Sequence, residues 1–225
     1  MSELSERRFR PVRPEEVERI CDLAVEAWRP IYRSYRHMLG DVMFDAAVYY
    51  QKFSRKPQLE LPDNFVLATI HRAENTDNLD RLKAIFEGLD KIGKTHPIIL
   101  PLHPRTRKTI KNENLDINDS IIRIIDPVSY LEIICLLEKC SLVMTDSGGL
   151  QKEAFFFKKP CVTLRNETEW VELVDNGVNV LAGADSERIY GLCKEALTKE
   201  YDFELDLYGK GDAGERIVRI LRDTA

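Results

Sequence analysis

From about Leu61 onward, short apolar runs alternate with stretches of helical spacing, and this alternation restricts the possible folds more than any other feature. The helical spacing is clearest at residues 77–93, where large apolar residues recur on one side. Strands that alternate with helices through short connections form a parallel sheet covered on both faces. We therefore predict an α/β protein with a three-layer α/β/α, Rossmann-like parallel sheet. The predicted strands are residues 65–70, 97–102, 121–125, 142–144, 161–164 and 179–182, and the predicted helices between them include 77–93, 105–111, 130–138 and 186–198.

The first 40 residues do not share this pattern. A predicted helix at residues 17–28 has Ile20 and Leu23 on its apolar side, and Pro30 interrupts it. A second predicted helix covers residues 41–53. We therefore expect a helical N-terminal extension, residues 1–40, followed by one Rossmann-like lobe, residues 41–225.

Charge and cysteine usage argue against several classes of protein. The formal net charge is −5 and no stripe of interleaved basic and aromatic residues appears, so no nucleic-acid surface is expected. No apolar run reaches the roughly 18 residues of a membrane span. The five cysteines have no CxxC spacing and the four histidines no carboxylate spacing, so we expect neither a disulfide framework nor a metal site. This usage is typical of a cytoplasmic protein.

Polar clusters follow four of the predicted strands. They are His71-Arg72-Ala73-Glu74-Asn75, His103-Pro104, residues 146–153, and Arg165 with Thr168-Glu169. The carboxyl ends of parallel strands meet at one edge of a sheet, and ligands bind outside this edge. Solvation alone does not explain four such clusters, so the sequence predicts a ligand site there.

The segment 145–149 forms a two-glycine turn between an apolar run and a helix. Glycine lets the backbone approach a ligand closely, and the first N–H groups of a helix carry a partial positive charge without an intrahelical partner. This arrangement suits a phosphate, with the Ser147 hydroxyl as a further donor and Glu153 as a partner for ribose hydroxyls. The alternative is that Gly148 and Gly149 only turn the chain.

Several motifs, in sequence order, resemble the non-hydrolysing UDP-N-acetylglucosamine 2-epimerases, which have two Rossmann-type lobes of the GT-B class. The matching motifs include Thr69-Ile70-His71-Arg72-Ala73-Glu74-Asn75, Leu102-His103-Pro104-Arg105-Thr106, Asp126-Pro127-Val128-Ser129-Tyr130-Leu131, residues 145–153, residues 159–165 and Tyr208-Gly209-Lys210-Gly211. The resemblance covers about residues 40–225 and only the C-terminal lobe of that family. The family's N-terminal lobe, with the acidic residues tied to movement of the C2 proton, has no counterpart. Residues 8–38 resemble instead the opening helices of GNAT-type N-acetyltransferases, without their acetyl-CoA loop.

The resemblance implies an anti elimination of UDP from the sugar, followed by re-addition after the C2 proton has changed face. Donors aimed at the leaving diphosphate would lower the barrier. The implied donors are Arg72, Ser147, the N–H groups of Gly148 and Gly149, and Arg165; the alternative is that these groups only cap helices or lie on the surface. His71 matches a family histidine tied to catalysis, which would hydrogen-bond the sugar or the leaving phosphate. The alternative is a structural histidine at a strand end.

Five further residues have an implied role and an alternative. Glu74 and Asn75 either orient the site or cap the following helix. Glu153 binds the ribose or lies on a solvated helix face. Val128 lies against the uracil or only packs. His103 matches a position that binds a second UDP-GlcNAc as an allosteric ligand in some members, or it is a polar strand-end residue. The resemblance implies neither a metal nor a nicotinamide cofactor.

We therefore expect the UDP-binding half of a UDP-N-acetylglucosamine 2-epimerase, an isomerase, with UDP-GlcNAc or UDP as ligand and little turnover by this chain alone. Two departures from the family concern local charge: Lys152 replaces an acidic residue, and Trp170-Val171-Glu172 replaces Arg-Pro-Glu. The alternatives are a non-catalytic module that binds UDP or a UDP-sugar, and a fragment of a GT-B glycosyltransferase. The expected protein partner is a complementing N-terminal lobe or a second copy in a homo-oligomer.

Overall fold

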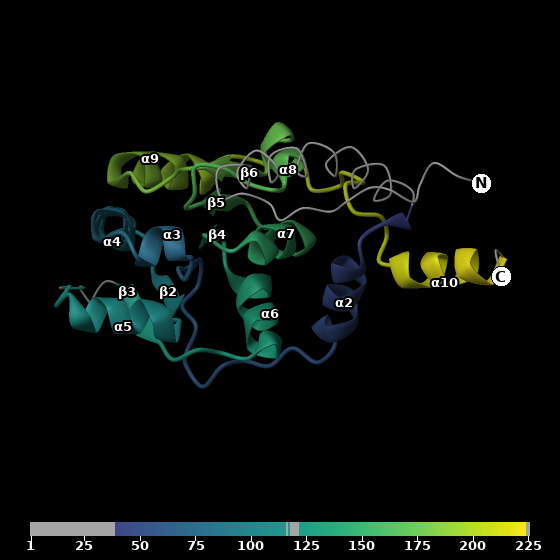
Figure 1. The fold of residues 1–225 in the computed structure, drawn as a ribbon, viewed down its shortest axis with the longest axis horizontal. Coiled ribbons are helices and arrows are strands. Elements are labelled where there is room, and N and C mark those ends of the chain that lie inside the picture. Colours follow the sequence, from purple (N-terminus) through teal and green to yellow (C-terminus); the bar gives the residue numbers. More distant parts are fainter. Residues whose placement is uncertain (1–38, 116, 118–121, 224–225) are drawn as a thin grey trace, which may run out of the picture.

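The computed structural model describes residues 39–115, 117 and 122–223, and six strands of this part form one sheet (Figure 1). All pairings are parallel, in the order β3-β2-β1-β4-β5-β6. The predicted helix at residues 17–28 and nearly all of the predicted extension lie outside the described residues. The strands are β1 (Val66–Thr69), β2 (Ile98–Pro101), β3 (Ile122–Ile125), β4 (Leu142–Thr145), β5 (Cys161–Thr163) and β6 (Asn179–Leu181).

The strand order places β1 and β4 side by side at the point where the chain changes direction across the sheet. Their register runs from Val66 opposite Leu142 to Thr69 opposite Thr145. The chain adds β2 and β3 on one side of β1, and β5 and β6 beyond β4, so the connections that leave β1 and β4 pass to opposite faces of the sheet. In open sheets of this kind, ligands bind between two such connections at the carboxyl ends of the strands.

Helices connect the strands, as the sequence predicts. They are α2 (Val42–Gln51), α3 (Ala73–Thr76), α4 (Leu79–Gly93), α5 (Pro104–Asn112), α6 (Tyr130–Lys139), α7 (Gly148–Phe156), α8 (Val171–Asp175), α9 (Ser186–Ala196) and α10 (Ala213–Asp223). Among the described residues no helix is both long enough and apolar enough to cross a lipid bilayer.

The helix predicted at residues 77–93 begins two residues later than expected. Asn78 has extended backbone angles, and its side chain accepts a hydrogen bond from the Arg81 N–H, so it is the N-cap of α4. The preceding residues form the separate short helix α3, which the periodicity does not predict. A single turn of helix is too short to show an apolar period.

The two faces of the sheet carry separate apolar cores, because successive residues of a strand point to opposite faces. On β1, Val66 and Ala68 pack in the core that includes α4 and α9, whereas Leu67 packs in the core that includes α6 and α7. All three side chains are fully buried. The sheet is therefore the middle layer between two layers of helices (Figure 1), and the predicted α/β/α arrangement is confirmed.

A buried ion pair fastens the beginning of α2 to α7. Lys152 is 1% exposed, and its ammonium group donates a hydrogen bond to the Asp41 carboxylate. The same ammonium group lies 4.4 Å from the centre of the Trp170 ring. Asp41 also caps α2, because its other oxygen accepts from the Met43 N–H at 2.8 Å. Removal of one partner of such a pair leaves an uncompensated buried charge, which costs about 3–5 kcal/mol. Lys152 therefore holds α2 against α7.

Two glycines let the chain pass over itself beside this ion pair. Gly40 and Gly209 have φ angles of +84° and +78°. A Cβ on Gly209 would lie 2.8 Å from the Gly40 Cα, and the Asp41 N–H donates to the Tyr208 carbonyl at 3.0 Å. Only glycine combines a positive φ with so close an approach of two backbones.

The substitution Gly209→Ala should therefore lower the free energy of unfolding by about 2 kcal/mol, because the added methyl group meets backbone and the positive φ is strained. Urea denaturation followed by circular dichroism measures this change. The matched control is Gly191→Ala in α9, where nothing lies within 4 Å of the added Cβ. That variant should gain about 0.5–1 kcal/mol from helix propensity. Equal stabilities of the two variants would contradict the close approach.

Candidate functional site

The strand-end edge of the sheet brings several sequence-predicted site residues together around Gly148, the first residue of α7. A Cβ placed on Gly148 would lie 3.3 Å from Glu169 Oε2 and 3.4 Å from Arg72 Nη2. Arg72 follows β1, Gly148 follows β4 and Glu169 follows β5. Three connections that are far apart in the sequence therefore meet at one point, beside the change of direction between β1 and β4.

The N-terminus of α7 presents backbone N–H groups at this point. Ser147 is its N-cap, with a hydroxyl that accepts from the Leu150 N–H at 3.5 Å and an N–H that donates to Thr145 Oγ1 at 2.9 Å. The N–H groups of Gly148 and Gly149 belong to the first turn, whose donors have no partner within the helix. A Cβ on Gly149 would have no neighbour closer than 3.8 Å. These donors and the helix dipole favour an anion here.

Asp146 is a fully buried carboxylate that joins the connections after β1 and β4. Its oxygens accept the backbone N–H of His71 at 3.0 Å and of Arg72 at 2.9 Å. The Asn75 amide donates to the same carboxylate at 3.1 Å. A buried charge is tolerated where donors surround it in this way. Asp146 therefore fixes residues 71–72 relative to the glycine turn.

Asn75 is fully buried and links three elements. Besides Asp146, its amide nitrogen donates to the Leu164 carbonyl at 3.0 Å, and its oxygen accepts from Arg81 Nε at 3.1 Å. Glu74 lies outside this core and accepts from Arg81 at 2.7 Å. Arg72 is the N-cap residue of α3 and makes no side-chain capping bond. Asn75 thus orients the loops, and Glu74 holds the arginine that orients Asn75.

His71 lies between Asp146 and His103, with its side chain 35% exposed. Its Nδ1 is 3.5 Å from Asp146 Oδ1, and its ring centre is 5.4 Å from that of His103. Burial lowers the pKa of His71 below its ordinary value, the Asp146 carboxylate opposes this shift, and His103 and Arg72 add to it. The neutral imidazole is therefore favoured near neutral pH.

Arg165 is a buried guanidinium that the structure pairs with Glu169. Its Nη1 lies 2.9 Å from Glu169 Oε2, and its Nη2 lies 3.1 Å from Oε1. Arg72 Nη2 approaches the same carboxylate at 3.9 Å. Arg165 Nε is buried and has no hydrogen-bond partner within the described residues. Burial acts to raise the pKa of Glu169, but Arg165, a backbone hydrogen bond and Arg72 together hold that pKa below its ordinary value. Two implied anion donors thus share an internal carboxylate.

Glu153 and Val128 lie in more enclosed surroundings than a solvated surface. Glu153 is in the second turn of α7, where burial raises its pKa and the Tyr130 hydroxyl, which hydrogen-bonds it, acts in the opposite direction. Glu153 therefore does not lie on a solvated helix face, which was the alternative to a role at the ribose. Val128 is partly buried and packs against the core that includes α6 and α7.

His103 is the N-cap residue of α5. Its Nδ1 accepts from the Arg105 N–H at 3.1 Å, so the ring caps the helix through that nitrogen. The structure brings His103 and His71 together, at the edge of the sheet where the polar clusters predict one ligand site. Their strands, β2 and β1, are neighbours in the sheet, and both histidines follow the strand ends.

Three residues shape this edge in ways that the sequence pattern did not predict. Asp146 and Arg81 hold Asn75, and Trp170 Nε1 donates to the Gly148 carbonyl at 2.6 Å. The contacts of Asp146 could have been predicted, because a carboxylate that directly follows a buried strand needs hydrogen-bond donors from a neighbouring connection. Nothing in the sequence pattern indicates the contact of Trp170.

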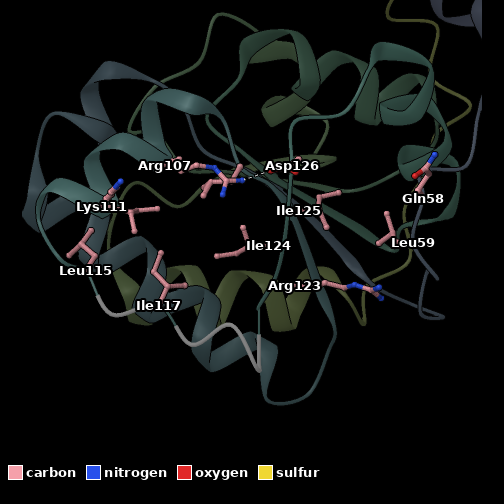
Figure 2. A pocket seen from close by; sticks show the side chains of 12 residues that line it. Gln58, Leu59, Arg107, Lys111, Leu115, Ile117, Arg123, Ile124, Ile125 and Asp126 are labelled. Carbon is pink, nitrogen blue, oxygen red and sulfur yellow. Dashed lines mark hydrogen bonds and ion pairs between the residues drawn. The ribbon is translucent and has the colours of Figure 1, made fainter.

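A large hollow lies elsewhere, at the β3 edge of the sheet beside α5 (Figure 2). It encloses about 850 Å³, and its rim carries the Arg107–Asp126 ion pair at 2.8 Å. None of the sequence-predicted site residues lines it. Size alone therefore does not identify the site.

Comparison with known proteins connects this arrangement with one family. Residues 34–222 match the model of the UDP-N-acetylglucosamine 2-epimerases. A Pseudomonas aeruginosa relative named UDP-2,3-diacetamido-2,3-dideoxy-D-glucuronate 2-epimerase is 49% identical over 185 residues, which are 81% of this chain and 51% of the relative. The UDP-N-acetylglucosamine 2-epimerase of Methanocaldococcus jannaschii is 39% identical over 197 residues, 82% of this chain and 54% of the relative. The chain thus spans about half the length of these relatives.

Solved structures agree with this match. The crystal structure of the M. jannaschii UDP-GlcNAc 2-epimerase in complex with UDP-GlcNAc and UDP superposes with a TM-score of 0.73 over 82% of this chain and 54% of that chain. The Neisseria meningitidis enzyme bound to UDP-GlcNAc gives a TM-score of 0.68 at 25% identity, over 82% of this chain and 54% of that chain. The resemblance seen in the motifs is thereby confirmed: the chain belongs to the UDP-N-acetylglucosamine 2-epimerase family.

Proposed function

We propose that this chain holds the UDP part of a UDP-sugar at the N-terminus of α7, as the nucleotide-binding half of a non-hydrolysing 2-epimerase. The observation that carries the proposal is the meeting of Arg72, Gly148 and the Arg165–Glu169 pair beside the change of direction between β1 and β4. The family membership and the relative crystallised with UDP support it.

The diphosphate would accept hydrogen bonds from the N–H groups of Gly148 and Gly149 and from the Ser147 hydroxyl. It would also face Arg72 and Arg165. Cleavage of the anomeric C–O bond leaves its electron pair on the diphosphate. Fixed donors that face this developing charge stabilise the transition state more than the bound substrate. The same donors would keep UDP in place for re-addition at C1, while C2 receives its proton on the opposite face. The guanidinium of Arg165 becomes available when Glu169 moves aside.

The remaining predicted residues would hold the rest of the nucleotide-sugar. Glu153, oriented by Tyr130, would accept the ribose hydroxyls, and Val128 would lie against the uracil. His71 would hydrogen-bond the sugar, and Asn75 would keep the loop of His71 in place. His103, beside His71, would meet the sugar or a second nucleotide-sugar.

Two sugars are candidates for the substrate. The family name and the M. jannaschii relative favour UDP-GlcNAc, converted to UDP-ManNAc. The 49% identity to a 2-epimerase of UDP-2,3-diacetamido-2,3-dideoxy-D-glucuronate favours a diacetamido uronic acid. Both share the UDP group and the C2 centre, so the nucleotide site argued above serves either one. Competition of the two nucleotide-sugars for the same UDP site, measured by calorimetry, ranks them.

The groups that move the C2 proton would come from a complementing N-terminal lobe, and self-association through the same face is the other expected arrangement. We place this activity in the cytoplasm. Calorimetric titration with UDP tests the binding step, and UMP, which lacks only the β-phosphate, is the control for the diphosphate. A coupled assay for 2-epimerisation, with and without the N-terminal lobe of a relative, tests catalysis. Activity that returns on complementation supports the enzyme half. UDP binding without any rescue supports the non-catalytic module, sugar transfer supports a glycosyltransferase, and absence of UDP binding sinks the proposal.

The variant Gly148→Ala should weaken UDP binding by about tenfold or more, a loss of roughly 1.4 kcal/mol. The added methyl group would lie within 3.4 Å of Arg72 and Glu169 and would keep a phosphate from the helix N-terminus. Calorimetry measures the dissociation constant. Gly191→Ala, the same chemical change in α9, should bind UDP like the parent chain.

Removal of the Glu169 carboxylate should strengthen UDP binding. Glu169→Gln should bind UDP about three- to fivefold more tightly, because a half-exposed ion pair worth up to about 1 kcal/mol no longer competes for Arg165 and Arg72. The matched control is Glu167→Gln, which removes the same charge from an exposed position on the same loop. If both variants bind UDP equally, Glu169 does not compete with the ligand.

A further inference from the structure

We propose that Asp146 is a positioning residue for His71: it keeps the ring proton on Nδ1 and leaves the lone pair of Nε2 as a hydrogen-bond acceptor. The inference deepens the proposed function, because it assigns His71 an accepting role toward the sugar. Only the identity of the ligand group that contacts Nε2 depends on the proposed function. The state of the ring itself follows from contacts within the chain.

The first contact is between the ring and the carboxylate. His71 Nδ1 lies 3.5 Å from Asp146 Oδ1, and the backbone N–H of His71 donates to that same oxygen at 3.0 Å. An ionised carboxylate offers only acceptors, so it favours a proton on the ring nitrogen that faces it. The separation is long for a hydrogen bond, as is common at catalytic groups before the substrate closes the site.

The second contact fixes the carboxylate. Asp146 Oδ2 accepts hydrogen bonds from the Arg72 N–H at 2.9 Å and from the Asn75 amide at 3.1 Å, so the carboxylate is held in place. The orientation of the Asn75 amide is also determined, because Arg81 donates to its oxygen and only acceptors, Asp146 and the Leu164 carbonyl, face its nitrogen. A continuous chain of hydrogen bonds therefore runs from Arg81 in α4 to the carboxylate that faces His71.

The charges around the ring favour its neutral form. Burial lowers the pKa of His71, and His103 from the connection after β2 and Arg72 from the same loop lower it too, against the effect of Asp146. A neutral imidazole carries one proton. With that proton on Nδ1, Nε2 has nothing to donate to the leaving diphosphate.

This state separates the two roles that the sequence leaves open for His71. Contact with the diphosphate falls to groups that always donate, the guanidinium of Arg72 and the amides at the N-terminus of α7. The imidazole instead accepts a proton or a hydrogen bond from a sugar hydroxyl, an acetamido N–H or an ordered water. Asp146 acts through His71 and does not itself meet the sugar.

The nitrogen-15 chemical shifts of the unliganded chain decide the position of the proton. Spectra recorded above the His71 titration midpoint should show a protonated, pyrrole-like Nδ1 and an unprotonated, pyridine-like Nε2. Through-bond correlation of each ring with its own backbone resonances identifies the His71 signals among the four histidines. A ring that carries its proton on Nε2 overturns the proposal. This measurement uses the unaltered fold, so it decides the question even if a variant fails to fold.

The substitution Asp146→Asn should lower the titration midpoint of His71 by about one pH unit, because it neutralises the one group among the described residues that raises the pKa of His71. It should also increase the fraction of rings with the proton on Nε2. The matched control is Asp126→Asn, which neutralises an exposed carboxylate after β3 and should leave both quantities unchanged. A His71 midpoint that does not fall in a folded Asp146→Asn variant overturns the proposal.

Neither measurement uses a nucleotide, so its failure is distinguishable from failure of UDP binding. A chain that binds UDP but carries the His71 proton on Nε2 keeps the nucleotide site and loses the positioning role of Asp146. A chain with the expected ring state but no affinity for UDP keeps the positioning role and loses the proposed function.

Discussion

The strand-end edge of this lobe depends on one buried carboxylate. Asp146 is fully buried, and a charge in that position is stable only where donors meet both of its oxygens. The donors come from His71, Arg72 and Asn75, all on the connection after β1. The geometry of that connection is therefore set by a residue on the connection after β4. Displacement of either loop would leave the carboxylate without partners.

The same edge balances its positive charge internally. Arg72 and Arg165 both face Glu169, and the carboxylate in turn lies beside the first glycine of α7. A cluster of cations and helix amides without an anion would be unfavourable in the unliganded protein. Glu169, with a side chain 48% exposed, supplies the anion. The pairing thus holds both guanidinium groups beside the N-terminus of α7.

Much of this arrangement was predictable from local pattern. Runs of apolar residues predict all six strands, and the helical spacing of residues 77–93 predicts the whole of α4 but begins two residues before it. The clusters at His71, His103, Ser147 and Arg165 were predictable as strand-end groups, because parallel strands expose their carboxyl ends at one edge. Asn78 as a cap was also readable in principle, since asparagine is among the residues preferred at that position.

The sequence by itself determined the parallel sheet, the order of elements along the chain and the residue types available at the strand ends, because these follow from periods of two and 3.6 residues and from turn chemistry. Only the tertiary structure decided that β1 lies beside β4, that Asp146 faces His71, that Lys152 lies buried against Asp41 and that Glu169 occupies the two arginines. Asp146 lies 75 positions from His71 and Lys152 lies 111 positions from Asp41, so no local pattern connects these residues. The physical reason is that a local period sets which face a side chain takes, whereas the pairing of buried charges depends on which loops the sheet brings together.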